Sequence, residues 1–457
     1  MLVALKSRDY RLHWLGQTIA LFGDQFHLIA MPWLVLQLTG SALQLGAVLA
    51  VAGITRAAFM LPGGALADRF APRDIMIWSN IIRGVIAAAL AVAVLGGTIE
   101  MWMLYVAAAA FGIITGIFEP ASQAAVPRLV DDERLESGNS LVFFGDQLAN
   151  FLGPAAAGAL IGWLGTRGAE GAGVAADTVA SGSLTGVGVA FVVHAVSFAI
   201  SIAFLVAMAP MKPLENSPEP AHPVRAIAEG MRFVISRSHL MWMLVLMAAA
   251  NLFTVGPLLV GVPVLANTQL PEGPAALGMI LSGFAFGNLL GVVVAGSTKR
   301  PAPRVLGAIV IVLFTAFGIG LASFAWVVST WTAVPIMAFI GIGNGFLGVT
   351  IVTYLQRSAP PEMIGRMMSL MMIGMFAMMP VSQALAGVII ESSIEALFLG
   401  AGIGLLLTAV VAASRPEVRE FGAATPNSQR RVEPNRGYVS TDPAKVGSEW
   451  RGVPIEL

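Results

Sequence analysis

The sequence predicts an all-α polytopic membrane protein in which twelve transmembrane helices form two parallel six-helix bundles. Apolar runs fill the chain from Leu12 to about Ser414, and each is close to or above the roughly 20 residues that cross a bilayer. The Lys and Arg residues fall almost entirely in every second gap between these runs. The chain also resembles itself at a shift of 229 residues, which indicates that one half repeats the other.

The composition excludes an ordinary soluble domain. Hydrophobic residues make up 57% of the 457 residues and charged residues 11%, against about 25% charged residues in soluble domains. The mean hydropathy is +0.81. The chain has no Cys, so we expect no disulfide, no thiolate metal site and no thiol nucleophile.

The first six spans are separated by gaps in which the apolar pattern stops. The first run follows Lys6, Arg8 and Arg11 and is too long for a removable signal peptide. Basic residues mark the gaps after the second and fourth runs: Arg69, Arg73, Arg128 and Arg134. We place the spans at residues 12–38, 43–66, 73–95, 101–122, 138–164 and 185–209.

The second six spans follow the same alternation. The gaps after the sixth, eighth and tenth runs hold Lys212, Arg225, Arg232, Arg237, Lys299, Arg300 and Arg357, with Arg304 and Arg366 at the ends of adjoining spans. The gaps after odd-numbered spans hold one basic residue, Arg167. We place these spans at residues 239–266, 275–297, 304–324, 332–354, 363–389 and 394–414.

This charge asymmetry predicts the orientation and the organisation of the chain. Because basic loops stay on the cytoplasmic side, we expect a multi-pass protein of the cell (inner) membrane with both termini in the cytoplasm. The expected units are an N-terminal bundle (1–209), a cytoplasmic linker (210–238), a C-terminal bundle (239–414) and a disordered tail (415–457). We expect an external loop at Gly165–Leu184 and an amphipathic surface helix at Val224–Ser236.

The internal repeat is clearest in the fourth and fifth spans. Gly112 and Gly116 recur as Gly341 and Gly345, and Gly158 recurs as Gly387, all at the same offset. An even number of spans in each half makes the two halves parallel, as in two-lobed transporters that rock about a central site. We interpret the glycine-rich run at 341–345 as close helix packing rather than a nucleotide fingerprint.

Four ionisable residues stand out inside the first half: Asp24, Arg56, Arg83 and Asp146. Asp24 and Arg56 lie roughly 18–20 Å along their spans, near the midplane, at 1.5 Å per residue. A charge there costs on the order of 3 kcal/mol on insertion scales. We therefore expect Asp24 to pair with Arg56, and Arg83 with Asp146. The second half offers neutral groups instead, among them Asn251 and Asn344.

The role of Asp24 has two open interpretations. Desolvation and a nearby arginine act in opposite directions on the pKa of a midplane carboxyl, so Asp24 can serve as a protonatable switch. The alternative is a permanent structural ion pair. Weaker candidates for the substrate or proton pathway are Gln17 and His27 on the first span and Asn150 on the fifth.

One loop carries a family signature. Gly64-Ala65-Leu66-Ala67-Asp68-Arg69-Phe70-Ala71-Pro72-Arg73-Asp74 resembles the cytoplasmic loop motif of the major facilitator superfamily, with Ala71 in place of the usual Gly and Asp74 in a usually basic position. Gly153-Pro154-Ala155-Ala156-Ala157-Gly158 is similar to an element of its antiporter branches. The opening of the chain resembles the branch of macrolide-efflux proteins and the enterobactin exporter. The fourth span lacks the arginine that many proton antiporters of this superfamily carry.

The resemblance implies a major facilitator fold with a conformational gate. It implies that Asp68 meets the start of the eleventh span near Arg366 and latches the outward-open state; a solvated anchor is the alternative. The implied gate residues are Gly64, Asp68, Arg69, Arg73, Arg83, Gly153, Pro154, Gly158 and Arg366.

The expected function is secondary active transport, with protons exchanged for an amphipathic small molecule such as a drug, macrolide or siderophore. The alternatives are a metabolite importer or facilitator of the same fold, and a polytopic membrane enzyme. No phosphate-binding loop is present in the sequence, so we expect no use of ATP. The five His lack metal-ligand spacing, and we expect no metal, no other cofactor and no nucleic acid partner.

Overall fold

The computed structural model describes residues 2–131, 134–171, 179–211, 232, 238–298, 303–358 and 378–419. Within these ranges the chain is almost entirely helical, without strands. Eleven of the described helices are long and apolar enough to cross a membrane, and Met378–Ile390 forms a shorter apolar helix. The predicted all-α membrane fold is therefore confirmed.

The first half begins with a short 3-10 helix and continues with six long helices. Their bounds are η1 Leu2–Lys6, α1 Arg8–Thr39, α2 Ala42–Arg69, α3 Pro72–Leu95, α4 Met101–Leu129, α5 Leu135–Gly171 and α6 Val179–Val206. The side chain of Ser7 caps α1, and Gly40 ends it with a positive φ of 63° that glycine adopts easily. The predicted loop at Gly165–Leu184 is too long, because α5 runs on to Gly171 and α6 already starts at Val179.

Where the second half is described, its helices match the predicted spans with one interruption. Its elements are α8 Ser238–Gly256, η4 Pro257–Gly261, α9 Val262–Thr268, α10 Pro274–Ser297, α11 Pro303–Ser323, η5 Phe324–Trp326, α12 Thr330–Ser358, the helix Met378–Ile390, α14 Ile394–Ser414 and α15 Pro416–Arg419. A π-helical turn, η4, breaks the seventh span between α8 and α9. Pro257 and Pro263 lack the N–H that a regular helix would use there.

The predicted disordered tail starts too early. Pro416–Arg419 forms α15, in which Val418 is fully buried and Glu417 accepts a 3.2 Å hydrogen bond from the Ser238 hydroxyl. The tail after Arg419, the expected helix at Val224–Ser236 apart from Arg232, and residues 359–377 lie outside the described residues.

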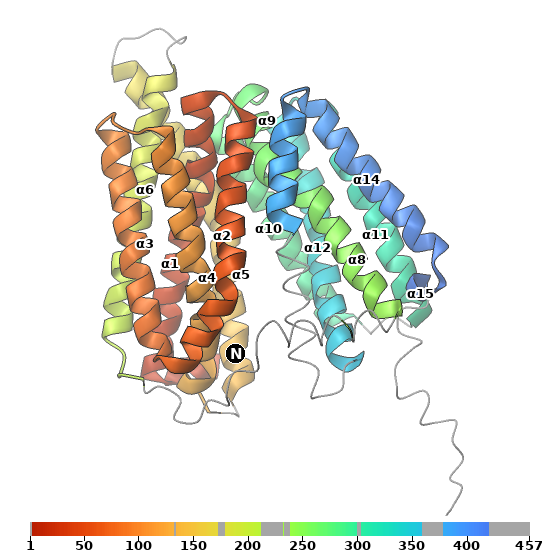
Figure 1. The fold of residues 1–457 in the computed structure, drawn as a ribbon, viewed down its shortest axis with the longest axis horizontal. Coiled ribbons are helices and arrows are strands. Elements are labelled where there is room, and N and C mark those ends of the chain that lie inside the picture. The colour runs from red at the N-terminus through yellow and green to blue at the C-terminus, as the bar shows by residue number, and fades with distance from the viewer. Residues whose placement is uncertain are drawn as a thin grey trace, which may run out of the picture.

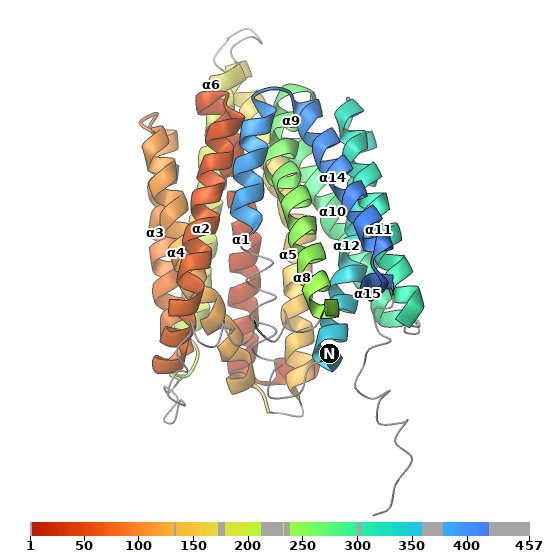
Figure 2. The ribbon, with the colours of Figure 1, turned by 45° about the vertical axis from the view of Figure 1, so that its right-hand side comes forward.

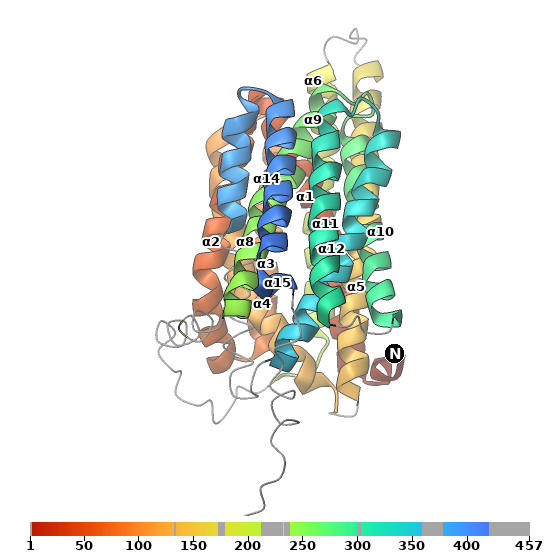
Figure 3. The same cartoon turned by 90° about the vertical axis from the view of Figure 1, so that its right-hand side faces the viewer.

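The helices form two groups (Figure 1). Helices α1–α6 make up the first, in which α2 packs on α4, α3 on α6, and α1 on both α5 and α6. Helices α8–α15 make up the second, in which α10 packs on α12 and α11 on α14 (Figure 3). The face at which α1 begins is called the N-terminal face below. It is the lower face in Figure 1.

The repeated glycines make the same contact in both groups. A Cβ atom on Gly116 would lie 2.6 Å from the backbone oxygen of Arg56 on α2. A Cβ atom on Gly345 would lie 2.1 Å from the backbone oxygen of Asn288 on α10. Only a residue without a side chain lets these helix backbones approach so closely. The run at 341–345 therefore serves helix packing.

The two groups touch most closely toward the face opposite the N-terminal face. There a Cβ on Gly158 of α5 would lie 2.3 Å from the backbone oxygen of Pro274 at the start of α10. On the other side of the seam, the helix Met378–Ile390 lies beside α2 (Figure 2). A Cβ on Gly46 of α2 would lie 2.5 Å from the backbone oxygen of Gln383. The Gln37 amide also donates a 2.9 Å hydrogen bond to Asn267, from α1 to α9. This face of the seam is closed by backbone contact.

We expect Gly158→Ala to destabilise the protein. The added methyl group collides with the backbone of α10, and such overpacking costs about 1–3 kcal/mol. The melting temperature of the purified protein should fall. Gly400→Ala on α14 is the matched control, because nothing lies within 4 Å of a Cβ at that position. Equal melting temperatures for the two variants would show that the seam is not packed as described.

Candidate functional site

Asp24 lies at the centre of a charged cluster inside the first group of helices. Its Oδ1 is 2.9 Å from Nε2 of His194 on α6, and its Oδ2 is 3.8 Å from Nη1 of Arg83 on α3. The side chains of Arg83 and His194 are 4% and 1% exposed, whereas that of Asp24 is 36% exposed. The carboxylate is therefore the accessible member of the cluster, and its two partners are enclosed.

Side chains from three helices, including its own helix α3, hold Arg83 in place. Its Nη2 donates a 2.5 Å hydrogen bond to Oδ1 of Asn80, whose amide donates to Ser201 on α6 at 3.0 Å. Its guanidinium lies 4.1 Å from the ring centre of Phe118 on α4 and 4.7 Å from that of Phe198 on α6. Such cation–π contacts stabilise a desolvated guanidinium. The positive charge beside Asp24 is thus held in one place.

Asp24 faces a small cavity of about 160 Å³. It is lined by α1, α3 and α4 through Gln17, Ala20, Leu21, Asp24, Arg83, Thr115, Phe118, Glu119, Ser122 and Gln123. Drug-sized ligands occupy about 300–1,000 Å³, so this cavity fits water or a polar group rather than a whole drug. Two carboxylates, those of Asp24 and Glu119, line it together.

Arg56 pairs with Glu119, across the contact between α2 and α4. Its Nε donates a 3.3 Å hydrogen bond to Oε2 of Glu119, and its Nη2 contacts Oε1. The predicted pairs of Asp24 with Arg56 and of Arg83 with Asp146 are therefore wrong. The physical reason is which helices pack together, because α2 packs mainly on α4 and only slightly on α1.

Sequence reasoning missed two members of these clusters. Glu119 is a charge within the fourth span, and Thr115 and Gln123 flank it at helical spacing, which is the sequence signal for a polar helix face. His194 has no metal-ligand spacing to another histidine in the sequence, so the sequence alone does not single it out. In the structure the rings of His27 and His194 are 5.2 Å apart. Among the described residues, no group of three or more His, Cys, Asp or Glu is arranged to hold a metal.

The other candidate side chains lie apart from the Asp24 cluster. Asp146 is half-buried on α5 beside Asn150, which accepts a 3.0 Å hydrogen bond from Gln25 on α1. Asn251 donates to the Met247 carbonyl of its own helix, and Asn344 is exposed on α12. These residues do not form one site.

The predicted gate residues lie in different parts of the structure and make different contacts. Arg73 donates hydrogen bonds of 2.8 Å to the carbonyls of Leu205 and Val206, which closes the C-terminus of α6 with a positive charge. Gly64 lies near the end of α2, where Asp68 and Arg69 are exposed. Arg366 lies outside the described residues, so the latch stays a prediction.

The Gly-Pro element of α5 lies at the seam between the two groups. A Cβ on Gly153 would lie 2.4 Å from Cγ of Gln25, and a Cβ on Gly278 would lie 2.3 Å from the backbone oxygen of Pro154. The backbone N–H of Ala155 also donates to the Ser282 hydroxyl at 3.0 Å. The element therefore links α1 on one side with α10 on the other.

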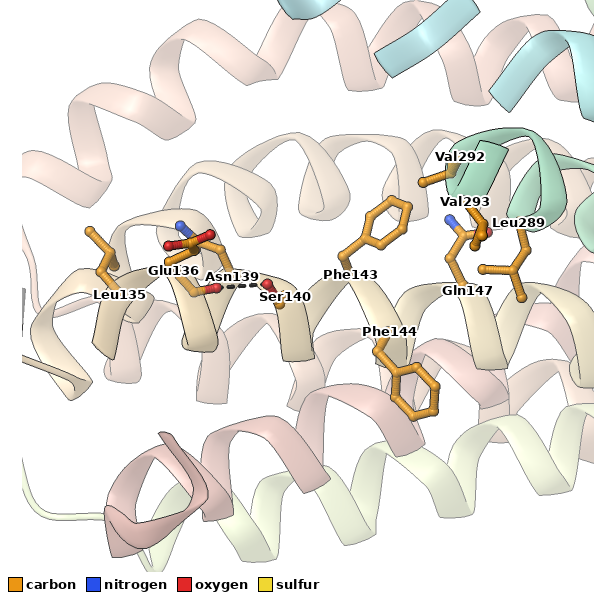
Figure 4. Close-up of a pocket in the computed structure, with 10 residues that line it drawn as sticks. All are labelled: Leu135, Glu136, Asn139, Ser140, Phe143, Phe144, Gln147, Leu289, Val292 and Val293. Atoms are coloured by element: carbon orange, nitrogen blue, oxygen red, sulfur yellow. Dashed lines mark hydrogen bonds between the residues drawn. The ribbon is translucent and has the colours of Figure 1, made fainter. Parts of the chain in front are cut away.

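A larger cavity of about 810 Å³ separates the groups toward the N-terminal face. It lies between the first part of α5 and the last part of α10, and Phe143 and Gln147 point toward Leu289, Val292 and Val293 (Figure 4). Its volume suits a drug-sized molecule. Further along, the helices close at Phe151 and Phe286, whose ring centres are 5.3 Å apart. Helices α5 and α10 thus meet at one face and part at the other.

Comparisons with known proteins agree with this architecture. The family model of the Major Facilitator Superfamily matches residues 14–383. The multidrug efflux pump Tap of Mycolicibacterium fortuitum is 24% identical, over 88% of this chain and 94% of its own length. Macrolide efflux protein A of Streptococcus pyogenes is 22% identical, over 89% of this chain and 96% of its own.

Solved structures share the fold. A nucleoside transporter, NupG, superposes with a TM-score of 0.67 at 10% identity and covers 89% of this chain and 99% of its own. A bacterial homologue of the iron transporter ferroportin, solved in an inward-facing state, superposes with a TM-score of 0.63 at 16% identity, with the same coverage of the two chains.

Reversing one charge of the Arg56–Glu119 pair should be more harmful than reversing both. Arg56→Glu or Glu119→Arg puts two like charges together inside the membrane, where an uncompensated charge costs about 2.5–3.5 kcal/mol on insertion scales. Arg56→Glu combined with Glu119→Arg restores opposite charges. We expect the single variants to give less folded protein in size-exclusion chromatography and the double variant to recover it. Single variants that fold as well as the parent would contradict the pairing.

Proposed function

The chain belongs to the Major Facilitator Superfamily and is a transporter rather than an enzyme, and from this premise we propose that it exports an amphipathic small molecule from the cytoplasm in exchange for protons. Drugs, macrolides and siderophores are the substrate types that we propose. The names of two relatives, a multidrug efflux pump and a macrolide efflux protein, support export of such molecules.

The way the lobes touch supports alternating access. The seam is closed at Gly158 and Gly46, and a cavity opens between α5 and α10 toward the N-terminal face. Arg69, Arg73, Arg128 and Arg134 lie at or next to the helix ends at the N-terminal face, so we propose that this face is cytoplasmic and that the protein lies in the inner membrane, in contact with lipid. The described conformation then accepts substrate from inside the cell. Rocking of the lobes about the seam would release it outside.

The single observation that supports proton coupling is the difference in exposure between Asp24 and its two partners. Its partners Arg83 and His194 are enclosed and fixed, while its own carboxylate reaches a cavity. A proton that binds this carboxylate removes the negative charge opposite Arg83 without moving any side chain out of the protein. The cluster then carries an uncompensated positive charge in a desolvated place, which favours a change of conformation.

The substrate would occupy the larger cavity while the proton site stays inside the first lobe. The aromatic and aliphatic side chains Phe143, Leu289 and Val292 suit the apolar part of an amphipathic molecule. Energy would come from the proton gradient, because the sequence has no phosphate-binding loop for ATP. We propose no cofactor and no nucleic acid partner.

Transport into inverted membrane vesicles tests the proposal. With the vesicle interior acidified, vesicles with the parent protein should accumulate a macrolide such as erythromycin or a cationic dye such as ethidium, and a protonophore should abolish this accumulation. Asp24→Asn keeps the shape of the side chain but cannot exchange a proton. We expect it to lose gradient-driven accumulation and to keep substrate exchange without a gradient.

Glu395→Gln is the matched control, since Glu395 is an exposed carboxylate at the start of α14. It should transport like the parent. Uphill accumulation by Asp24→Asn would rule out Asp24 as the coupling site. Accumulation in right-side-out vesicles instead of inverted ones would indicate an importer.

A further inference from the structure

The two oxygens of Asp24 have different partners. Oδ1 accepts a hydrogen bond from His194 at 2.9 Å, whereas Oδ2 is 3.8 Å from the nearest nitrogen of Arg83. The latter distance allows electrostatic attraction but no hydrogen bond. The Asp24–Arg83 ion pair is thus incompletely closed, and the sequence does not indicate why.

Both partners are held in place. Asn80, Phe118 and Phe198 fix the guanidinium of Arg83. The His194 ring stacks on Phe111 with an angle of 15° between the ring planes and lies 4.7 Å from the ring of Phe198. The position of the carboxylate between them is therefore decided by which partner binds it more closely.

A glycine makes the contact with His194 possible. A Cβ on Gly23 would lie 1.8 Å from the Ser197 hydroxyl oxygen and 3.5 Å from the His194 ring. Without a side chain at residue 23, α1 packs directly on α6, and the next residue, Asp24, reaches the imidazole. The pair Gly23-Asp24 thus directs the carboxylate toward α6.

We infer that His194 is a positioning residue that keeps Asp24 from closing a permanent ion pair with Arg83. By donating Nε2–H to Oδ1, His194 leaves Oδ2 as the oxygen that binds and releases the proton at the small cavity. Without this hydrogen bond the carboxylate turns to Arg83 and forms a closed salt bridge. Such a bridge holds the charge permanently and cannot serve as a switch.

The charged and titratable groups around Asp24 point to His194 as the positioning residue. The charged and titratable groups around Asp24 are Arg83 on α3, Glu119 on α4 across the small cavity, His194 on α6, and His27 one turn further along α1. Helix α5, which also packs on α1, carries Asp146 beside Asn150. Glu119 is already bound by Arg56. The inference rests on the proposed proton coupling through Asp24.

The test compares three variants in inverted vesicles across a series of imposed pH gradients. His194→Gln keeps an N–H donor at nearly the same reach, while His194→Leu removes it. We expect His194→Gln to keep the parent's dependence of accumulation on pH. His194→Leu should lose gradient-driven accumulation but keep substrate exchange at zero gradient. His13→Gln is the control, because His13 is a second histidine of the first lobe with 1% exposure.

The outcomes separate this inference from the proposed function. If His194→Leu keeps the parent's pH profile while Asp24→Asn loses coupling, the positioning role is overturned and coupling through Asp24 stands. If Asp24→Asn itself accumulates substrate uphill, proton coupling through Asp24 fails, and this inference fails with it. If His194→Leu does not fold, His194→Asn serves in its place, since its amide is too short to reach Asp24. A changed pH profile in His194→Asn that is absent in His194→Gln supports the inference.

Discussion

A carboxylate within the hydrocarbon region of a bilayer needs protein groups around it, because no bulk water is present to solvate it. Asp24 imposes this requirement on the first lobe. Helix α3 supplies Arg83, α6 supplies His194, and α4 supplies the aromatic face of Phe118. The close approach of α1 to α6 at Gly23 follows from the same need. Much of the packing of this lobe can be understood as compensation for one charge.

In the proposed mechanism the two lobes divide the work of transport. Charged pairs occur inside the first lobe, where Asp24 and Glu119 line a cavity too small for a drug. The space for a larger molecule lies between the lobes, against the apolar side chains of α5 and α10. The lobes meet through glycine backbones at Gly158 and Gly46, where the helices approach most closely. In this proposal, a proton bound in the first lobe changes the position of the second.

The sequence was sufficient for the fold but not for the site. Apolar run length and sided charge predict where the described helices lie, because bilayer thickness leaves little freedom. They predict the helix ends less well, since α4 and α5 each run seven residues past the end of the predicted span. The repeated glycines likewise predicted close packing. Pairing of charges depends on which helices are neighbours and how each is rotated, and neither follows from linear spacing. This is why Asp24 was assigned to Arg56, and why Glu119 and His194 were overlooked. The π-helical turn at Pro257–Gly261 was also not foreseen, since two prolines within a span are compatible with several local geometries.

The account depends on Asp24 changing its protonation state during transport. A pH-difference infrared spectrum of the purified protein in lipid measures this directly, because a protonated carboxyl group has a carbonyl band that a carboxylate lacks. The account predicts that such a band appears as the pH is lowered through the range in which transport is active, and that it is missing from the spectrum of Asp24→Asn. Identical difference spectra for the two proteins would show that Asp24 does not change its protonation state in this range, and would contradict the account.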